Sequence, residues 1–203
     1  MNRNMDDQTA SYYKTNAVSF FEETRDVDMT PLYDRFLPLI PAGGHILDAG
    51  CGSGRDARYF LNRGYRITAF DASSELAALA TEYSGIPVSI LRFQDFDWKL
   101  EFDGIWACAS LLHVPSPELA DSLGRLTNAL KPAGTLYASF KYGHGEREHH
   151  GRRFTDLDEQ SLALLLHEAG GLEELDTWIT ADRRPGRGDE RWFNTLLQRS
   201  AET

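Results

Sequence analysis

Residues 45–56 read His-Ile-Leu-Asp-Ala-Gly-Cys-Gly-Ser-Gly-Arg-Asp, and this stretch decides the fold. A short apolar run ends in an acid, Asp48, and glycines follow at the alternate positions Gly50, Gly52 and Gly54. Because glycine has no Cβ atom, such a turn can adopt positive φ values and lets a ligand approach the backbone closely. A strand, a glycine turn and a helix in succession are typical of a nucleotide-like ligand bound at the carboxyl end of a parallel strand.

Outward from this turn, apolar strand-like runs alternate with helix-like segments. After the strand at about 46–48, further strands are expected at 66–71, 87–92, 102–109, 134–140, 173–180 and 190–198. Helices are expected at 30–40, 56–62, 75–83, 115–130 and 158–168. The last two strands are joined by an arginine- and glycine-rich loop and should be antiparallel. The alternation predicts an α/β fold, a Rossmann-like three-layer sandwich whose seven-stranded sheet is mostly parallel with an antiparallel last strand.

Composition narrows the class of protein. The 203 residues carry a net charge of −10, from 21 basic and 31 acidic side chains, which disfavours an extended nucleic-acid surface. No apolar run approaches the roughly 20 residues of a membrane-spanning helix, and the polar, acidic N-terminus does not resemble a secretory signal. Cys51 and Cys108 lie in apolar strand-like surroundings, as expected of reduced thiols. A cytoplasmic protein is predicted.

Five motifs occur in order along the chain: LDAGCGSG at 47–54, Asp71 after the second strand, QDF at 94–96, FDGIWACASLLHV at 102–114 and LKPAGTLYASF at 130–140. With these motifs the chain resembles the class I S-adenosylmethionine-dependent methyltransferases, from Pro31 to Arg199. Within that superfamily it is most similar to small-molecule methyltransferases, including the tellurite-resistance type, whose glycine loop also continues into Gly-Arg. The resemblance implies S-adenosyl-L-methionine as cofactor and a small molecule as methyl acceptor.

The acids of these motifs suit the parts of that cofactor. Asp48 would pair with the ammonium of the methionine part, directly or through water. Asp71 would accept hydrogen bonds from the ribose diol, and Asp95 would accept one from the adenine amino group. Asp71 could instead be only a helix N-terminal acid, and Asp95 only a turn acid. The expected cofactor-binding residues are Asp48, Ala49, Gly50, Gly52, Gly54, Asp71, Ala72, Gln94, Asp95, Phe96, Cys108 and Ala109.

NAD is the rival ligand, because it also requires glycines after the first strand and an acid after the second. Its fingerprint is Gly-x-Gly-x-x-Gly, whereas here the third glycine comes one residue earlier and position 55 is Arg. The acid before the glycines and the Gln94-Asp95 pair also have no role in the NAD pattern. The spacing therefore favours S-adenosylmethionine.

The acceptor side carries fewer signals. His113 is the one titratable side chain after the fourth strand, so it is the candidate catalytic base or orienting group, although it could equally be packed under the cofactor. Tyr13 of the N-terminal arm, with Arg153 and Arg184 from the loops 141–154 and 181–189, are the candidate acceptor-binding residues. Arginine suits carboxylate and phosphate, which predicts an anionic acceptor. The same arginines could instead pair with the acids of their own loops.

The loop 141–154 is rich in His and Glu, yet its glycines are typical of a mobile lid, so no metal site is predicted. One domain of residues 1–203 is expected. It would comprise an N-terminal arm and helix (1–44), a cofactor-binding core (45–140), and a lid loop with C-terminal substrate-side elements (141–203). Two alternatives stay open, an RNA-modifying methyltransferase and a non-catalytic cofactor-binding partner subunit. The acceptor atom and the oligomeric state are also open.

Overall fold

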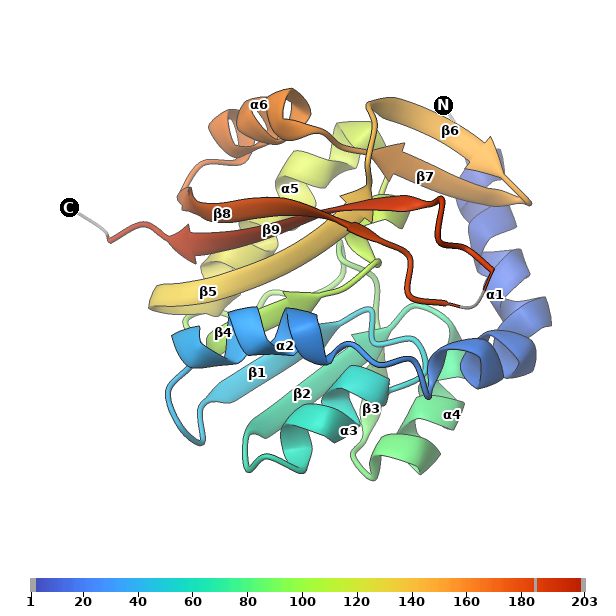
Figure 1. Cartoon of the computed structure of the whole chain (residues 1–203), viewed down its shortest axis with the longest axis horizontal. Helices are drawn as coiled ribbons and strands as arrows, with labels where there is room; N and C mark the ends of the chain where they lie inside the picture. The colour runs from blue at the N-terminus through green and yellow to red at the C-terminus, as the bar shows by residue number, and fades with distance from the viewer. Residues whose placement is uncertain (1–2, 185, 202–203) are drawn as a thin grey trace.

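The computed structural model describes residues 3–184 and 186–201, with the side chains from residue 8 onward. Its centre is a seven-stranded sheet of order β3-β2-β1-β4-β5-β9-β8 (Figure 1). The strands are β1 (His45–Ala49), β2 (Arg66–Asp71), β3 (Val88–Ile90), β4 (Phe102–Ala107), β5 (Leu130–Lys141), β8 (Leu172–Ala181) and β9 (Arg191–Arg199). Strands β1 to β5 are parallel, and β9 runs antiparallel to both of its neighbours, β5 and β8. The predicted sheet is confirmed.

The central strands are apolar at successive positions because both faces of the sheet are covered. Neighbouring residues on a strand point to opposite faces, so each such pair contributes to two separate cores. One core receives Leu47, Ile105, Leu136 and Leu197. The other receives their sequence neighbours Ile46, Trp106, Tyr137 and Leu196, with Trp106 stacked on Tyr137 at 3.9 Å between ring centroids.

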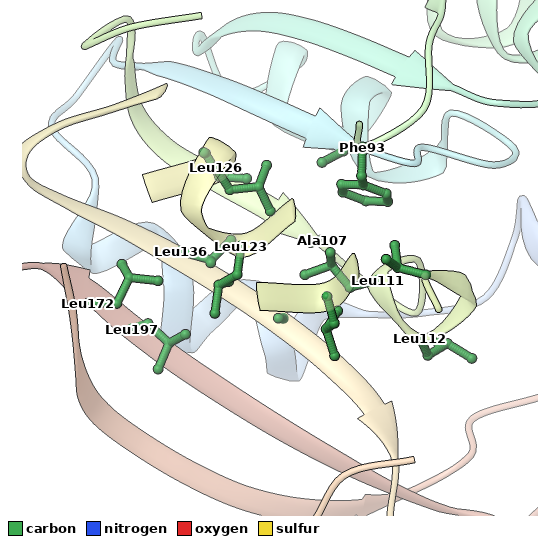
Figure 2. Packing of buried hydrophobic residues seen from close by; sticks show 14 of the residues in the cluster. Phe93, Ala107, Leu111, Leu112, Leu123, Leu126, Leu136, Leu172 and Leu197 are labelled. Atoms are coloured by element: carbon green, nitrogen blue, oxygen red, sulfur yellow. The ribbon is translucent and has the colours of Figure 1, made fainter. Parts of the chain in front are cut away.

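Helices close the two faces. One face is covered by α5 (Ser116–Ala129) and α6 (Glu159–Ala169), and Figure 2 shows Leu123 and Leu126 of α5 beside Leu136 of β5. The other face is covered by α2 (Thr30–Phe36), α3 (Arg55–Leu61) and α4 (Ser74–Ser84). Two short 3-10 turns, η1 (Leu37–Leu39) and η2 (Leu111–His113), follow α2 and β4. The three layers agree with the prediction.

Two segments differ from, or sharpen, the sequence expectation. The N-terminal arm is one long helix, α1 (Arg3–Thr24), which packs on α4 and on the hairpin described next (Figure 1). The predicted loop 141–154 is wrong in part, because it holds β6 (Gly145–His149) and begins β7 (Arg152–Asp156). His150 and Gly151, with φ of 51° and 69°, make the tight turn that joins them. Strand β7 is buried throughout, whereas β6 is exposed throughout and therefore polar.

Among the residues that the structure describes, no helix combines the length and the apolar character that crossing a membrane requires.

Candidate functional site

A cavity of about 1080 Å³ opens at the carboxyl edge of the sheet. Strand β1 lies between β2 and β4, so the chain reverses its direction of strand addition there, which is where ligands bind in sheets of this kind. The segments that follow five parallel strands all line the cavity: Gly50–Ser53, Asp71–Leu76, Leu91–Gln94, Cys108–Ser110 and Lys141–Tyr142. Further walls come from α1, the β6–β7 hairpin and the loop between β8 and β9.

The glycine turn is shaped by contacts that exclude side chains. Gly50 has a φ of 73°, and a Cβ atom there would lie 2.5 Å from Cβ of Ser110. Ser110 in turn donates a hydrogen bond to the Ala49 carbonyl at 2.6 Å, which fixes the turn against the end of β4. Gly50 and Gly52 line the cavity. Gly54 begins α3 and allows close packing on Ala80, and neither it nor Ala49 is among the lining residues.

Asp71 ends β2 inside the cavity wall. Its two carboxylate oxygens accept hydrogen bonds from the backbone N–H groups of Gly52 and Ser73, each at 2.9 Å. Burial raises the pKa of Asp71, although these backbone donors act in the opposite direction. A carboxylate has about four lone-pair positions, so Asp71 retains acceptor capacity for two ligand hydroxyls.

A buried charge cluster lies behind the turn. Asp56 accepts hydrogen bonds from Tyr33, from Trp106 Nε1 at 2.8 Å, and from two nitrogens of Arg55. Arg55 and Asp56 line the cavity, whereas Asp48 is 2 % exposed and is not among the lining residues. Burial first, and then the nearby Asp56, raise the pKa of Asp48 well above its usual range. Oδ2 of Asp48 has no hydrogen-bond partner among the described residues.

The remaining expected cofactor residues divide into two groups. Ala72, Gln94, Cys108 and Ala109 line the cavity, and the Gln94 amide donates to Glu118 at 2.8 Å. Asp95 and Phe96 are outside the lining set. The Asp95 carboxylate is paired with Arg92 at 2.9 Å, and Phe96 stacks on Trp98 in the core.

Comparison with known proteins supplies the family. A family model described as a methyltransferase domain matches residues 46–134. The solved structure of 1,6-didemethyltoxoflavin-N1-methyltransferase from Burkholderia thailandensis, with bound 1,6-didemethyltoxoflavin and S-adenosylhomocysteine, superposes with a TM-score of 0.74. It is 27% identical and covers 94% of this chain and 88% of its own. In fold, and in sequence over residues 46–134, the chain is similar to the class I S-adenosylmethionine-dependent methyltransferases.

The curated relatives match about half of the chain. A malonyl-[acyl-carrier protein] O-methyltransferase of Pectobacterium atrosepticum is 47% identical over 109 residues, covering 51% of this chain and 42% of that protein. A ubiquinone biosynthesis O-methyltransferase of Xanthomonas axonopodis is 32% identical over 108 residues, covering 50% and 44%. The chain thus spans less than half the length of either relative.

S-adenosylmethionine is the cofactor of this class, and the residues present fit it. The turn has no room for a Cβ atom at Gly50 and little at Gly52, and Asp71 offers free acceptor positions at the cavity wall. The buried and unpartnered oxygen of Asp48 suits a cationic group bound close to the turn. No group of three or more His, Cys, Asp or Glu side chains in the described part of the chain is arranged to hold a metal ion.

On the acceptor side of the methyltransferase cavity, His113 is held between two partners. Nδ1 lies 2.6 Å from the Arg153 carbonyl oxygen, which can only accept, so Nδ1 carries the proton. Nε2 is then the acceptor for the Tyr13 hydroxyl at 2.8 Å. Burial lowers the pKa of His113 to about 4, and burial raises the pKa of Tyr13 to about 12. Both groups are therefore neutral at pH 7.

This depressed pKa predicts a pH dependence of stability. An unfolded histidine binds a proton near pH 6.5, whereas folded His113 resists protonation down to about 4, so stability falls as the pH drops through this window. Between pH 7 and pH 5 we expect a loss of about 1–2 kcal/mol, since the ring borders the cavity and is partly screened. Urea unfolding at both pH values should show a smaller difference in His113→Asn. The exposed control His144→Asn should keep the wild-type difference, and an unchanged difference in His113→Asn would contradict the assignment.

The two arginines predicted to bind the acceptor are both ion-paired. Arg153 is 2 % exposed, pairs with Glu146 Oε1 at 2.8 Å, and is not among the lining residues. Arg184 lines the cavity, but its guanidinium makes two bonds to Asp182, of 3.0 and 2.6 Å. Tyr13 does line the cavity. The structure also brings in Arg152, which belongs to the same arginine-rich segment but is not one of the predicted acceptor-binding residues. The turn residues His150-Gly151 were the signal for the strand that carries it.

Proposed function

We propose that the protein transfers the methyl group of S-adenosylmethionine to a small molecule that carries an anionic group. The observation that supports this most is the continuity of the cavity. The same cavity borders the glycine turn and Asp71 on one side and the basic residues of the hairpin and the β8–β9 loop on the other. The Burkholderia relative holds a small organic substrate, 1,6-didemethyltoxoflavin, and the Xanthomonas relative is named for ubiquinone biosynthesis, which supports a small acceptor.

The cofactor carries its methyl group on a sulfonium sulfur. When the methyl group is transferred, the rest of the cofactor leaves as a neutral thioether. The protein then has to hold the acceptor in line with the bond between the sulfur and the methyl carbon, and to exclude water. Tyr13 and Phe20 of α1 line the cavity and pack edge-to-face at 5.2 Å, so this helix covers the site. His113 orients Tyr13 and, with Nε2 unprotonated, would accept a proton released by the acceptor through the Tyr13 hydroxyl.

Within this proposal, Asp71 accepts hydrogen bonds from the ribose and Asp48 counters the ammonium. The turn glycines, Ala72, Cys108 and Ala109 let the backbone approach the cofactor. The assignment of Asp95 and Phe96 to the adenine end stays a prediction, and adenine binding by Asp95 would compete with its pair to Arg92.

Ligand selectivity gives the first test. S-adenosylhomocysteine should bind with micromolar affinity, that is, about −8 kcal/mol, because the glycine spacing and the acids fit its parts. NAD should not bind, because the fingerprint for its pyrophosphate is absent. Isothermal calorimetry with both ligands decides the matter. Binding of NAD without binding of S-adenosylhomocysteine would refute the proposal.

The activity itself is tested with a cell extract and isotopically labelled cofactor. Mass spectrometry should find a small labelled product that forms with the wild-type protein and, at limiting cofactor, much more slowly with Asp71→Ala. Label recovered in RNA, together with salt-dependent binding of bulk tRNA, would favour the RNA-modifying alternative. No labelled product despite tight cofactor binding would favour a non-catalytic partner subunit.

A further inference from the structure

Two basic residues of the cavity wall are buried, Lys141 and Arg152, and of these only Lys141 has a carboxylate partner in the part of the chain described. Arg152 is the first residue of β7, is 9 % exposed, and lines the cavity. Its guanidinium carbon lies 4.3 Å from the ring centroid of Tyr12 and 5.2 Å from that of Phe154. Aromatic faces attract a cation by about 1–2 kcal/mol but do not neutralise it.

Five other cations around the acceptor side are each balanced by a carboxylate. The pairs are Lys141 with Glu190, Arg147 with Asp156, Arg153 with Glu146, Arg183 with Asp28, and Arg184 with Asp182. Arg152 forms no ion pair with any residue that the structure describes, and its Nε has no hydrogen-bond partner there. A buried charge without a counter-charge is strongly unfavourable, so the site is incomplete without an anion.

The polar neighbours of Arg152 do not provide that anion. Burial raises the pKa of the Tyr13 hydroxyl to about 12, against the opposing influence of the Arg152 charge, so Tyr13 is neutral. Tyr13 also donates its proton to His113, which is itself neutral. The positive charge of the Arg152 guanidinium is therefore not compensated by the neighbouring protein groups.

We propose that Arg152 is the receptor for the anionic group of the acceptor, and that this group is a carboxylate on an apolar or aromatic body. The inference rests on the proposed function, since it places the acceptor in this cavity. A planar guanidinium matches a carboxylate with two parallel hydrogen bonds. One unbalanced cation suits a monoanion, whereas a phosphate dianion would require a second one. The Phe154 ring lies beside the guanidinium and lines the cavity, so it offers apolar surface to the body that bears the carboxylate.

The probes are 4-fluorobenzoate and its neutral counterpart 4-fluorobenzamide, followed by fluorine NMR. Wild-type protein should bind the benzoate in the millimolar range and the benzamide at least tenfold more weakly. Arg152→Gln should weaken benzoate binding about tenfold or more and remove the preference. Arg147→Gln is the matched control, because Arg147 also lies over the Phe154 ring but already pairs with Asp156, and it should keep the preference.

Arg152→Lys is a second variant in case Arg152→Gln does not fold. It keeps the positive charge but lacks the planar guanidinium that can make two parallel hydrogen bonds. It should retain the preference for benzoate with reduced affinity. Titrations run with and without S-adenosylhomocysteine separate the two proposals, because failure of that ligand to bind refutes the proposed function alone. Absence of a benzoate preference in the wild type, or its survival in Arg152→Gln or loss in Arg152→Lys, overturns the role of Arg152.

Discussion

Replacing Asp56 by alanine is expected to lower the free energy of unfolding by about 3–5 kcal/mol. The side chain is 5 % exposed and is the shared acceptor for Tyr33, Trp106 and Arg55. Its loss would leave a buried guanidinium without a counter-charge and two buried donors without a partner. Burial would raise the pKa of Asp56, but Arg55 and these donors hold it below its usual value, so the group is ionised at neutral pH.

Chemical denaturation of the wild type and Asp56→Ala measures this loss. Asp95→Ala is the control, because it removes an ion pair that is exposed, and such pairs contribute about 0–1 kcal/mol. Asp56→Asn keeps one acceptor oxygen and should be intermediate. A loss in Asp56→Ala no larger than that of the control would show that the cluster is structurally dispensable.

Replacing Asp71 by alanine should weaken the binding of S-adenosylhomocysteine about 10- to 150-fold, corresponding to about 1.5–3 kcal/mol for charged hydrogen bonds to the ribose. The variant also deprives the Gly52 and Ser73 N–H groups of their acceptor, so the turn that cradles the ligand loses its support. Calorimetric titration of the folded variant gives the affinity, and a thermal melt shows how much of the protein is folded.

Asp103→Ala is the matched control for this experiment. Asp103 is also a half-buried acid that accepts a backbone N–H, from His45 at 2.8 Å, and it pairs with Lys131 at 2.9 Å. It is the second residue of β4, at the opposite edge of the sheet from the cavity, and is not among the lining residues. Its replacement should lower stability without changing affinity. Equal affinity in wild type and Asp71→Ala would reduce Asp71 to a turn-stabilising acid.

The sheet could be predicted from the sequence because its central strands are buried on both faces. Continuous apolar runs such as the one around Ile105 have no other stable arrangement in a chain of alternating helices and strands. The expectation was weakest for the third strand, where six residues were predicted and three pair. Strand β3 lies at the edge of the sheet, pairs only with β2, and exposes Ile90, so its length is not set by a core.

The residues on the acceptor side were harder to predict from the sequence, because neighbouring residues on a strand point to opposite faces. Once a strand carries Arg152 and Arg153, one guanidinium lines the cavity and the other turns to Glu146. The sequence interpretation treated this segment as a loop, so it had no basis for choosing between them. The sequence indicates only that Asp56 begins a helix. Its partners Tyr33 and Trp106 could not be predicted, because they approach Asp56 only through the tertiary fold.

The position of β9 has a consequence for how the chain is made. This strand enters between β5 and β8 and supplies the hydrogen-bonding partner of both. A ribosome that has completed β8 holds a nascent chain in which β5 presents a long open edge and β8 has no neighbour. Such edges recruit other strands, and contacts between distant segments form slowly. We therefore expect the finished sheet to form in one late step, with chaperones engaging the chain until residue 199 has emerged.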